Sequence, residues 1–317
     1  MTQTQVVVLD DYQRVAASCA DWARVDGDVR FAHEHLEGQD LVAALRDASV
    51  VVAMRERTAF DAHLLARLGQ LRLLVTTGAV NASIDVAAAA RHGVTVCGTR
   101  SLPSPAAEMT WALLLALVRQ LPRADADVRA GRWQTTVGTE LAGKTLGVVG
   151  LGRLGQRVAR VGLAFEMEVR AWSQNLDPDA ARDLGVAPTV SKDDLLTRSD
   201  VVTLHLKLSD RTRGIIGARE LALMRPGAYL VNTSRGPLVD EAALVDVLVA
   251  GRIAGAGLDV YDREPLPPGH PLLTAPRTVL SPHLGYVTDG SYRVFYQDVV
   301  EDVVAWQHGA PTRVIAP

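Results

Sequence analysis

The chain has 317 residues, of which 48% are hydrophobic and 22% charged, and its formal net charge at pH 7 is −3. That length exceeds what one hydrophobic core usually supports, so we expect two globular domains and not a disordered chain. Lysine and arginine are scattered among aspartate and glutamate, which argues against the basic surface of a nucleic-acid-binding protein.

The N-terminal segment lacks the basic region and long apolar run of a signal peptide. The longest apolar stretch, residues 111–118, is too short to cross a bilayer. Cys19 and Cys97 lie far apart without C-x-x-C or metal-ligand spacing, so neither a disulfide framework nor a metal site is expected. We therefore expect a cytoplasmic protein with no membrane partner.

Short runs rich in valine, leucine and isoleucine alternate with longer stretches rich in alanine and leucine. Such apolar runs, separated by helical lengths, are typical of a parallel sheet covered by helices on both faces, and predict an α/β fold. The predicted strands are residues 6–9, 50–54, 73–76, 145–149, 168–171, 201–204, 229–232 and 256–260.

This alternation stops and restarts in the middle of the chain. One set of strands ends before Gly98, and another begins at Lys144. Between them, closely spaced prolines open a long apolar helix predicted within residues 101–120. From Ser291 on, aromatic residues and valine recur at helical spacing, and we expect this last helix to return to the first domain.

A glycine-rich turn follows one of these strands and precedes a helical stretch. Its glycines, Gly150, Gly152 and Gly155, form the pattern G-x-G-x-x-G. They permit, in order, a tight turn, close approach of the backbone to a pyrophosphate, and close packing of helix on strand. We interpret the turn as a dinucleotide-binding site that includes Arg153 and Leu154, with a purely structural turn as the less favoured alternative.

Ser173 ends the next predicted strand, where a carboxylate that binds the ribose hydroxyls is expected. A carboxylate would repel a 2′-phosphate, so its absence removes the usual discrimination against NADP. No arginine follows at once to bind that phosphate, because Gln174 and Asn175 come next. The expected cofactor is NAD or NADP, and the choice between them stays open.

Beyond the turn, much of the chain resembles the D-isomer-specific 2-hydroxyacid dehydrogenase family. The segments that carry this resemblance are residues 76–85, 141–152, 230–237, 257–265 and 281–285, in the family's order. The resemblance implies two Rossmann-like parallel-sheet domains, with the cofactor domain inserted into a substrate domain built from both chain ends. It places the substrate domain at residues 1–99 plus 290–317 and the NAD(P)-binding domain at 100–289, and it implies a homodimer.

Three residues match the family's catalytic positions: Arg235 in Asn-Thr-Ser-Arg-Gly, Glu264 in Asp-Arg-Glu-Pro and His283 in Ser-Pro-His-Leu. Reduction of a 2-oxo acid needs a cation for the carboxylate, a proton donor for the oxygen, and a group that keeps the donor protonated. Arg235, His283 and Glu264 suit these roles in that order. The alternatives are a surface arginine, a structural histidine and an ordinary solvated carboxylate.

Glu264 also favours a hydroxy acid as the substrate, because the similar formate dehydrogenases pair their histidine with glutamine. We therefore expect an oxidoreductase that transfers a hydride between NAD(P)H and C2 of a small 2-oxo or D-2-hydroxy acid. The alternative is a non-catalytic NAD(H)-sensing binding protein of the same fold, like the similar C-terminal-binding-protein corepressors, since fold alone does not decide function.

Other candidate substrate contacts lie in the first domain. Gly78, Ala79 and Val80 match the family's loop whose backbone N–H groups bind the substrate carboxylate, with an ordinary strand-to-helix turn as an equal alternative. Arg55 and Arg57 follow another strand and could reach a second anionic group, although a solvated charge run is favoured.

Thr233 and Asp259 complete the candidate cofactor contacts. Asp259 ends a predicted strand and matches the residue expected near the nicotinamide amide, with a strand-terminal cap as the alternative. Lys207 and Tyr286 depart from the family, where many members carry proline and a small residue. These departures leave the size and polarity of the substrate open.

Overall fold

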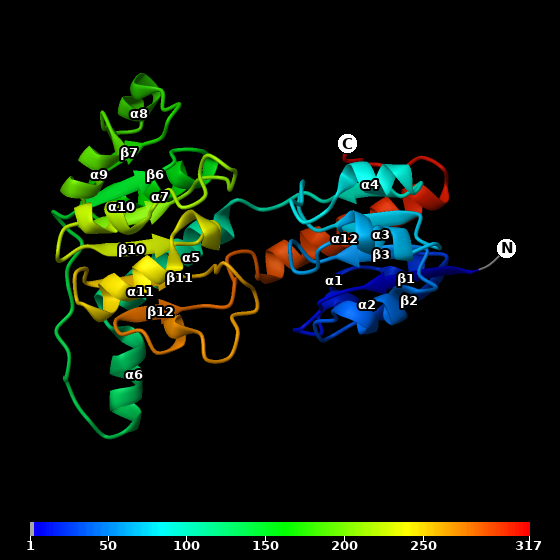
Figure 1. The fold of residues 1–317 in the computed structure, drawn as a ribbon, viewed down its shortest axis with the longest axis horizontal. Helices are drawn as coiled ribbons and strands as arrows, with labels where there is room; N and C mark the ends of the chain where they lie inside the picture. The colour runs from blue at the N-terminus through cyan, green and yellow to red at the C-terminus, as the bar shows by residue number, and fades with distance from the viewer. Residues whose placement is uncertain (1–2) are drawn as a thin grey trace. The chain divides into compact units, whose positions relative to one another are not determined.

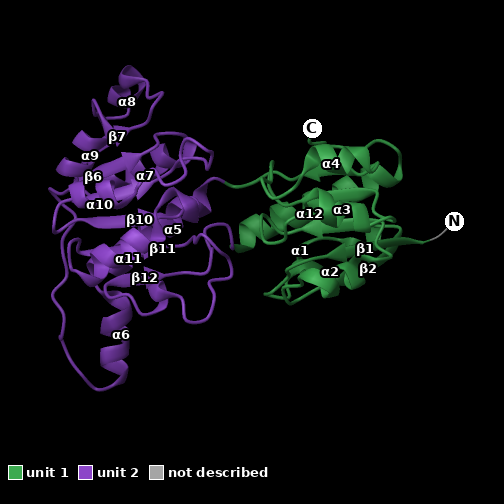
Figure 2. Cartoon of the chain, viewed as in Figure 1, with its two compact units in different colours: residues 1–102, 288–317 green, residues 103–287 purple. Residues whose placement is uncertain are grey.

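The computed structural model describes residues 3–317 (Figure 1). The chain forms two compact units, unit 1 with residues 1–102 and 288–317, and unit 2 with residues 103–287 (Figure 2). The boundaries expected from the sequence fell at 99/100 and 289/290. Each unit is built on a parallel sheet, so the predicted α/β class with two Rossmann-like domains is confirmed.

Unit 1 contains a five-stranded sheet in the order β2-β1-β3-β4-β5. Its strands are β1 (Thr4–Val8), β2 (Gly27–Phe31), β3 (Val50–Ala53), β4 (Leu73–Thr76) and β5 (Thr95–Gly98). Its helices are α1 (Ala16–Cys19), η1 (Trp22–Arg24), α2 (Gly38–Leu45), α3 (Ala62–Arg67), α4 (Val86–Arg91) and α12 (Asp289–Gln307). The central strands β3 and β4 are buried along their whole length, which explains their continuous apolar sequence.

Unit 2 contains a seven-stranded sheet in the order β12-β11-β10-β9-β6-β7-β8. Its strands are β6 (Thr145–Val149), β7 (Glu168–Trp172), β8 (Ala187–Pro188), β9 (Val201–Leu204), β10 (Tyr229–Asn232), β11 (Gly255–Leu258) and β12 (Thr278–Leu280). Its helices are α5 (Ser104–Val118), α6 (Leu121–Arg129), α7 (Arg153–Ala164), α8 (Pro178–Asp183), α9 (Lys192–Arg198), α10 (Ala218–Leu223), η2 (Gly236–Leu238), α11 (Glu241–Val249) and η3 (Pro271–Leu273).

The strands differ from the sequence prediction in several places. Strand β11 ends at Leu258 and not at residue 260, and the side chain of the next residue, Asp259, binds the loop that follows β12. Four strands are absent from the predicted set, namely β2, β5, β8 and β12. Strand β2 illustrates the physical reason. It lies at the edge of its sheet and alternates half-buried with exposed residues, so its sequence lacks a continuous apolar run.

The C-terminal helix α12 belongs to unit 1. Tyr292, Phe295, Tyr296 and Val299 are buried along it, and the helix contacts both β4 and α1. No helix in residues 3–317 is long and apolar enough to span a membrane.

Candidate active site

The three catalytic candidates all lie in unit 2, on segments that follow neighbouring strands. Arg235 follows β10, Glu264 follows β11 and His283 follows β12. Because these strands are parallel and adjacent, their carboxyl ends meet at one edge of the sheet, which is where open α/β sheets bind ligands. The strand order thus gathers residues that are 48 positions apart in the chain, from 235 to 283.

Glu264 and His283 form a direct pair. Glu264 Oε2 lies 2.5 Å from His283 Nδ1, and Glu264 Oε1 accepts the N–H of Tyr261 at 3.0 Å. A carboxylate at Nδ1 favours the tautomer in which Nδ1–H donates to it, so Nε2 is left to exchange a proton with a substrate. The pair therefore has the geometry of an acid–base group held in one orientation by a carboxylate.

Asp259 holds the loop that carries His283. Its carboxylate is buried and accepts hydrogen bonds from the hydroxyl of Ser281 at 2.5 Å and from the N–H groups of Leu284 and Gly285 at 2.7 Å. Burial raises the pKa of this carboxyl group. Because its partners bracket His283 in sequence, Asp259 orients the backbone on both sides of that residue.

Tyr261 links the strands that precede Glu264 and His283. Its side chain is buried, and its hydroxyl lies 3.0 Å from the carbonyl oxygen of Ser281 and 3.3 Å from that of Leu258. The ring of Tyr286 meets that of His283 edge-on, with centroids 5.3 Å apart. The imidazole is thus restrained by an aromatic contact as well as by the carboxylate.

Arg235 lies in a turn shaped by Asn232. The amide of Asn232 donates to the carbonyl oxygen of Arg235 at 2.9 Å, and its oxygen accepts the N–H of Ser234 at 3.1 Å. Arg235 is half-buried, and one of its Nη1 hydrogens goes to the carbonyl oxygen of Ser234 at 2.7 Å. The planar guanidinium carries N–H donors in a fixed fork, a geometry that suits the binding of a carboxylate.

The glycine-rich turn between β6 and α7 has the shape that a dinucleotide requires. Gly150 has a φ of +100°, and an added Cβ would lie 2.8 Å from the carbonyl oxygen of His205. A Cβ on Gly155 would lie 2.0 Å from the carbonyl oxygen of Gly150, so helix and turn pack closely. At Gly152, a Cβ would meet no atom of the described chain within 4 Å. This open space at the start of a 12-residue helix fits a pyrophosphate.

The other candidate cofactor contacts lie around this turn or on the neighbouring strands. Arg153 and Leu154 form the first turn of α7, and Ser173 follows β7 directly. Thr233 is buried, with its Oγ1 2.7 Å from that of Thr110 on α5. In residues 3–317 no group of three histidine, cysteine, aspartate or glutamate side chains could hold a metal ion.

Residues 78–80 of unit 1 follow β4, but Gly78 differs from its neighbours. It is buried, and its N–H donates to the hydroxyl of Thr99 at 2.7 Å. Ala79 and Val80 are exposed, and within the described residues no hydrogen bond uses their N–H groups. The N–H groups available for a carboxylate are therefore those of Ala79 and Val80.

Arg55 and Arg57, which follow β3, are both held by the protein. Arg55 Nη1 donates to the carbonyl oxygen of Thr77 at 3.1 Å, which brings the guanidinium against Gly78. Arg57 Nη1 donates to the carbonyl oxygen of Asp10 at 2.7 Å, and its guanidinium carbon lies 4.5 Å from the centre of the Tyr12 ring. The sequence favoured a solvated charge run for these two residues, but both side chains are bound to other parts of unit 1.

Comparison with known protein families identifies unit 2. The profile described as D-isomer specific 2-hydroxyacid dehydrogenase, NAD binding domain, matches residues 111–285. A glyoxylate reductase from Aeropyrum pernix is 41% identical over 259 residues, which cover 78% of this chain and 77% of that one. A D-3-phosphoglycerate dehydrogenase from Mycobacterium tuberculosis is 41% identical over 83% of this chain. The chain matches only half the length of that second relative.

Two solved structures of similar proteins superpose on nearly the whole chain. A phosphoglycerate oxidoreductase from Vibrio cholerae superposes with a TM-score of 0.92 at 37% identity, covering 97% of this chain and 100% of that one. A D-lactate dehydrogenase from Aquifex aeolicus, complexed with NAD and lactic acid, has a TM-score of 0.80 at 27% identity, with 96% of each chain covered. The chain therefore belongs to the D-isomer specific 2-hydroxyacid dehydrogenase family, NAD(P)-dependent oxidoreductases that act on 2-oxo and 2-hydroxy acids.

Proposed function

We propose that His283, Glu264 and Arg235 catalyse the reduction of a small 2-oxo acid to the D-2-hydroxy acid and the reverse oxidation. The observation that carries this proposal is the 2.5 Å contact between Glu264 Oε2 and His283 Nδ1 at the edge where β10, β11 and β12 end. Nothing in the structure or among the relatives favours the non-catalytic alternative.

In this mechanism His283 moves the proton. With Nδ1–H donated to Glu264, the ring gives the Nε2 proton to the carbonyl oxygen during reduction and takes it back from the hydroxyl during oxidation. The negative charge of Glu264 favours the imidazolium that reduction consumes. A bound nicotinamide supplies or accepts the hydride at C2.

Arg235 binds the substrate carboxylate and polarises the carbonyl group, since its planar guanidinium matches a carboxylate in two hydrogen bonds. For residues 78–80 we propose that Ala79 and Val80 offer their backbone N–H groups to a substrate carboxylate, while Gly78 fixes the turn through Thr99.

For the cofactor, we propose contacts from Gly150, Gly152, Gly155, Arg153, Leu154, Ser173, Thr233 and Asp259. The open space at Gly152 supports the pyrophosphate contact. Since three donors of the loop after β12 occupy the Asp259 carboxylate, we propose that Asp259 affects the nicotinamide through that loop. Ser173 supports weak discrimination between NAD and NADP, tilted toward NADP.

For the substrate, we propose a small 2-oxo acid, with Arg55 and Arg57 contacting a second anionic group where one is present. Arg55 supports this because its guanidinium lies against Gly78, beside the proposed carboxylate-binding N–H groups. The names of the relatives, glyoxylate reductase and D-3-phosphoglycerate dehydrogenase, span substrates without and with such a group.

The deciding experiment is steady-state oxidation of NADH and NADPH with glyoxylate, pyruvate, hydroxypyruvate and phosphohydroxypyruvate. Turnover of one or more acids, with His283→Ala impaired mainly in kcat and Arg235→Ala in both kcat and KM, supports the proposed roles. Tight NADH binding without turnover of any acid would favour the sensing protein instead.

We also propose a homodimer. In unit 2, α6 and the segment after it project away from the sheet (Figure 1). This segment exposes Leu121, Val128, Trp133 and Val137, with 77% of Trp133 and 90% of Val137 accessible, an arrangement that a second copy would cover. Light scattering should give twice the chain mass, and Trp133→Glu should lower it; a wild-type monomer would contradict the proposal.

We further propose that the enzyme is cytoplasmic and has no nucleic-acid or membrane partner. Both cysteines are free thiols, and burial raises the pKa of Cys97 to about 12. Such unreactive, unpaired thiols suit a reducing compartment. Fractionation of the source cells, with the activity in the membrane-free soluble fraction, is the corresponding test.

A further inference from the structure

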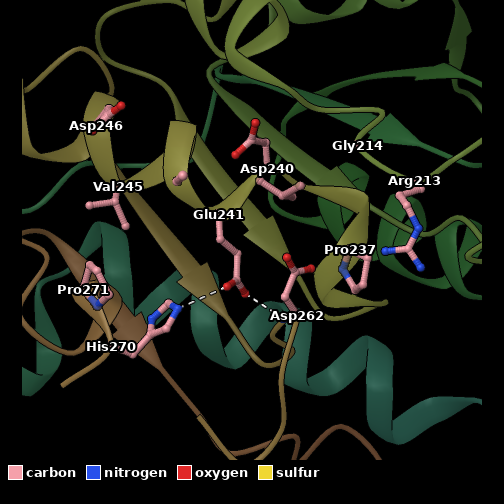
Figure 3. Close-up of a pocket in the computed structure, with 12 residues that line it drawn as sticks. Arg213, Gly214, Pro237, Asp240, Glu241, Val245, Asp246, Asp262, His270 and Pro271 are labelled. Atoms are coloured by element: carbon pink, nitrogen blue, oxygen red, sulfur yellow. Dashed lines mark hydrogen bonds and ion pairs between the residues drawn. The ribbon is translucent and has the colours of Figure 1, made fainter. Parts of the chain in front are cut away.

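A pocket of about 640 Å³ in unit 2 is lined in part by Asp262 and His270, which flank Glu264 in the sequence. Figure 3 shows Glu241 in its centre, pointing from the start of α11 toward Asp262 and His270. Asp262 and His270 are the two ends of the segment in which Glu264 lies. The side chain of Glu241 therefore closes this segment into a loop at its base.

The contacts of Glu241 are specific at both oxygens. Its Oε1 accepts the N–H of Asp262 at 2.7 Å, and its Oε2 lies 3.4 Å from Nε2 of His270. The other ring nitrogen of His270 accepts the N–H of Leu272 at 3.3 Å, so in the neutral ring the hydrogen is on Nε2 and faces Glu241. Glu241 and His270 thus form a second carboxylate–imidazole pair.

This pair acts on the backbone next to the Glu264 contact. Tyr261 and Asp262 are consecutive, and the N–H of Tyr261 is bound by Glu264 while that of Asp262 is bound by Glu241. Gly236 packs against the Tyr261–Asp262 peptide, because an added Cβ there would lie 1.9 Å from the carbonyl carbon of Tyr261. Loss of the Glu241 contact would release the Tyr261–Asp262 peptide, which directly follows the Val260–Tyr261 peptide whose N–H binds Glu264.

The surroundings of Glu241 explain why its contacts must be kept. It is the first residue of α11, where the helix dipole favours a negative charge, but only 13% of its side chain is exposed. Burial raises the pKa of its carboxyl group. A carboxylate in this position is stable only while its hydrogen bonds are made, so it holds its partners in a narrow range of geometry.

We propose that Glu241, supported by His270, is a positioning residue that sets the orientation of Glu264 toward His283 without touching the substrate. The proposal rests on the catalytic roles proposed above for Glu264 and His283. It predicts that a change at Glu241 alters the protonation behaviour of the reaction, which a residue that only stabilises the fold would not do.

Glu241→Ala tests this directly. We expect kcat for 2-oxo acid reduction to fall roughly ten- to a hundredfold, as for misplaced catalytic groups, with KM nearly unchanged. The alkaline limb of kcat/KM for reduction should move to lower pH, as expected for loss of the Glu264 charge. Glu241→Gln keeps an oxygen that accepts the Asp262 N–H and should restore most of kcat. Hydrogen exchange of residues 259–270 should speed up in the alanine variant only.

Glu220 provides a matched control. It lies in the first turn of α10, its side chain is also 13% exposed, and it accepts the N–H of Gly217 at 3.2 Å and pairs with Lys192 at 3.1 Å. Glu220→Ala should lower the free energy of unfolding without moving the pH profile. If the Glu241 and Glu220 variants behave alike, Glu241 only stabilises the fold and the proposal is wrong.

A double variant separates this proposal from the proposed function. If Glu241 acts through Glu264, adding Glu241→Ala to Glu264→Gln should change kcat less than twofold beyond the single glutamine variant. Fully multiplicative losses would overturn the positioning role. If Glu264→Gln alone leaves the pH profile unmoved, the assignment of Glu264 and His283 fails first, independently of Glu241.

Discussion

The N–H of Gly285 donates to Oδ2 of Asp259 at 2.7 Å, and this bond joins the end of β11 to the loop after β12. The same carboxylate accepts the N–H of Leu284 and the hydroxyl of Ser281, so its negative charge faces only donors. His283 lies inside the segment that these bonds hold.

Asp259→Asn should therefore destabilise unit 2 and impair catalysis together. The amide nitrogen would face an N–H donor of the loop, and an unsatisfied buried donor costs about 1–3 kcal/mol. Urea unfolding and kcat should both report the change. Asp262→Asn, at an exposed carboxylate in the neighbouring segment, is the control. Equal unfolding midpoints for the two variants would contradict this role of Asp259.

Glu264→Gln keeps the size of the side chain but removes the charge beside His283. The alkaline limb of kcat/KM for 2-oxo acid reduction should move to lower pH, because the imidazolium loses its stabilising carboxylate. Oxidation of the hydroxy acid, which needs the neutral ring, should persist or begin at lower pH. The loss should be smaller than for His283→Ala, since general acid–base catalysis contributes roughly a hundred- to ten-thousandfold. If the alkaline limb of kcat/KM does not move, the proposed pairing of Glu264 with His283 is wrong.

Ser173→Asp places a carboxylate directly after β7. We expect kcat/KM for NADPH to fall by roughly tenfold more than for NADH, equivalent to about 1.4 kcal/mol of repulsion from the 2′-phosphate. Ser173→Asn is the uncharged control. An equal response of both cofactors would show that Ser173 does not contact the adenosine ribose.

Asp302 on α12 gives unit 1 a pH-dependent stability. It is fully buried, and burial raises its pKa from 3.8 to about 6 even though Thr312 and Arg313 hydrogen-bond to its Oδ1. The folded state then binds more protons than the unfolded state between these values, so this group's contribution to stability is lost as pH rises from about 4 to 6.

Asp302→Asn removes that titration. Relative to the wild type, the variant should gain up to about 3 kcal/mol in the free energy of unfolding between pH 4 and pH 7, at about 1.36 kcal/mol per pKa unit. The comparison is made by urea unfolding at both pH values. A difference between variant and wild type that does not change with pH would refute the assigned cause.

Much of the fold could be predicted from the sequence because its signals are local. Strands such as Leu73–Thr76 and Val201–Leu204 are buried on both faces and therefore apolar without interruption. The glycines at 150 and 155 are equally local signals, since a positive φ and a close backbone approach exclude a side chain at the position itself. The sequence also located Glu264 and His283, through the order of short motifs.

The sequence could not determine which hydrogen-bond partners the buried polar groups have. The histidine-proline pair at 270–271 and the acidic pair at 240–241 gave no signal that Glu241 and His270 meet, or that they enclose the Glu264 loop. Likewise, only the structure showed that the N–H of Gly78 donates to the hydroxyl of Thr99 and that Asp259 binds the loop after β12. A hydrogen bond depends on the distance between two atoms in space, and the order β12-β11-β10 sets that distance for residues far apart in the chain.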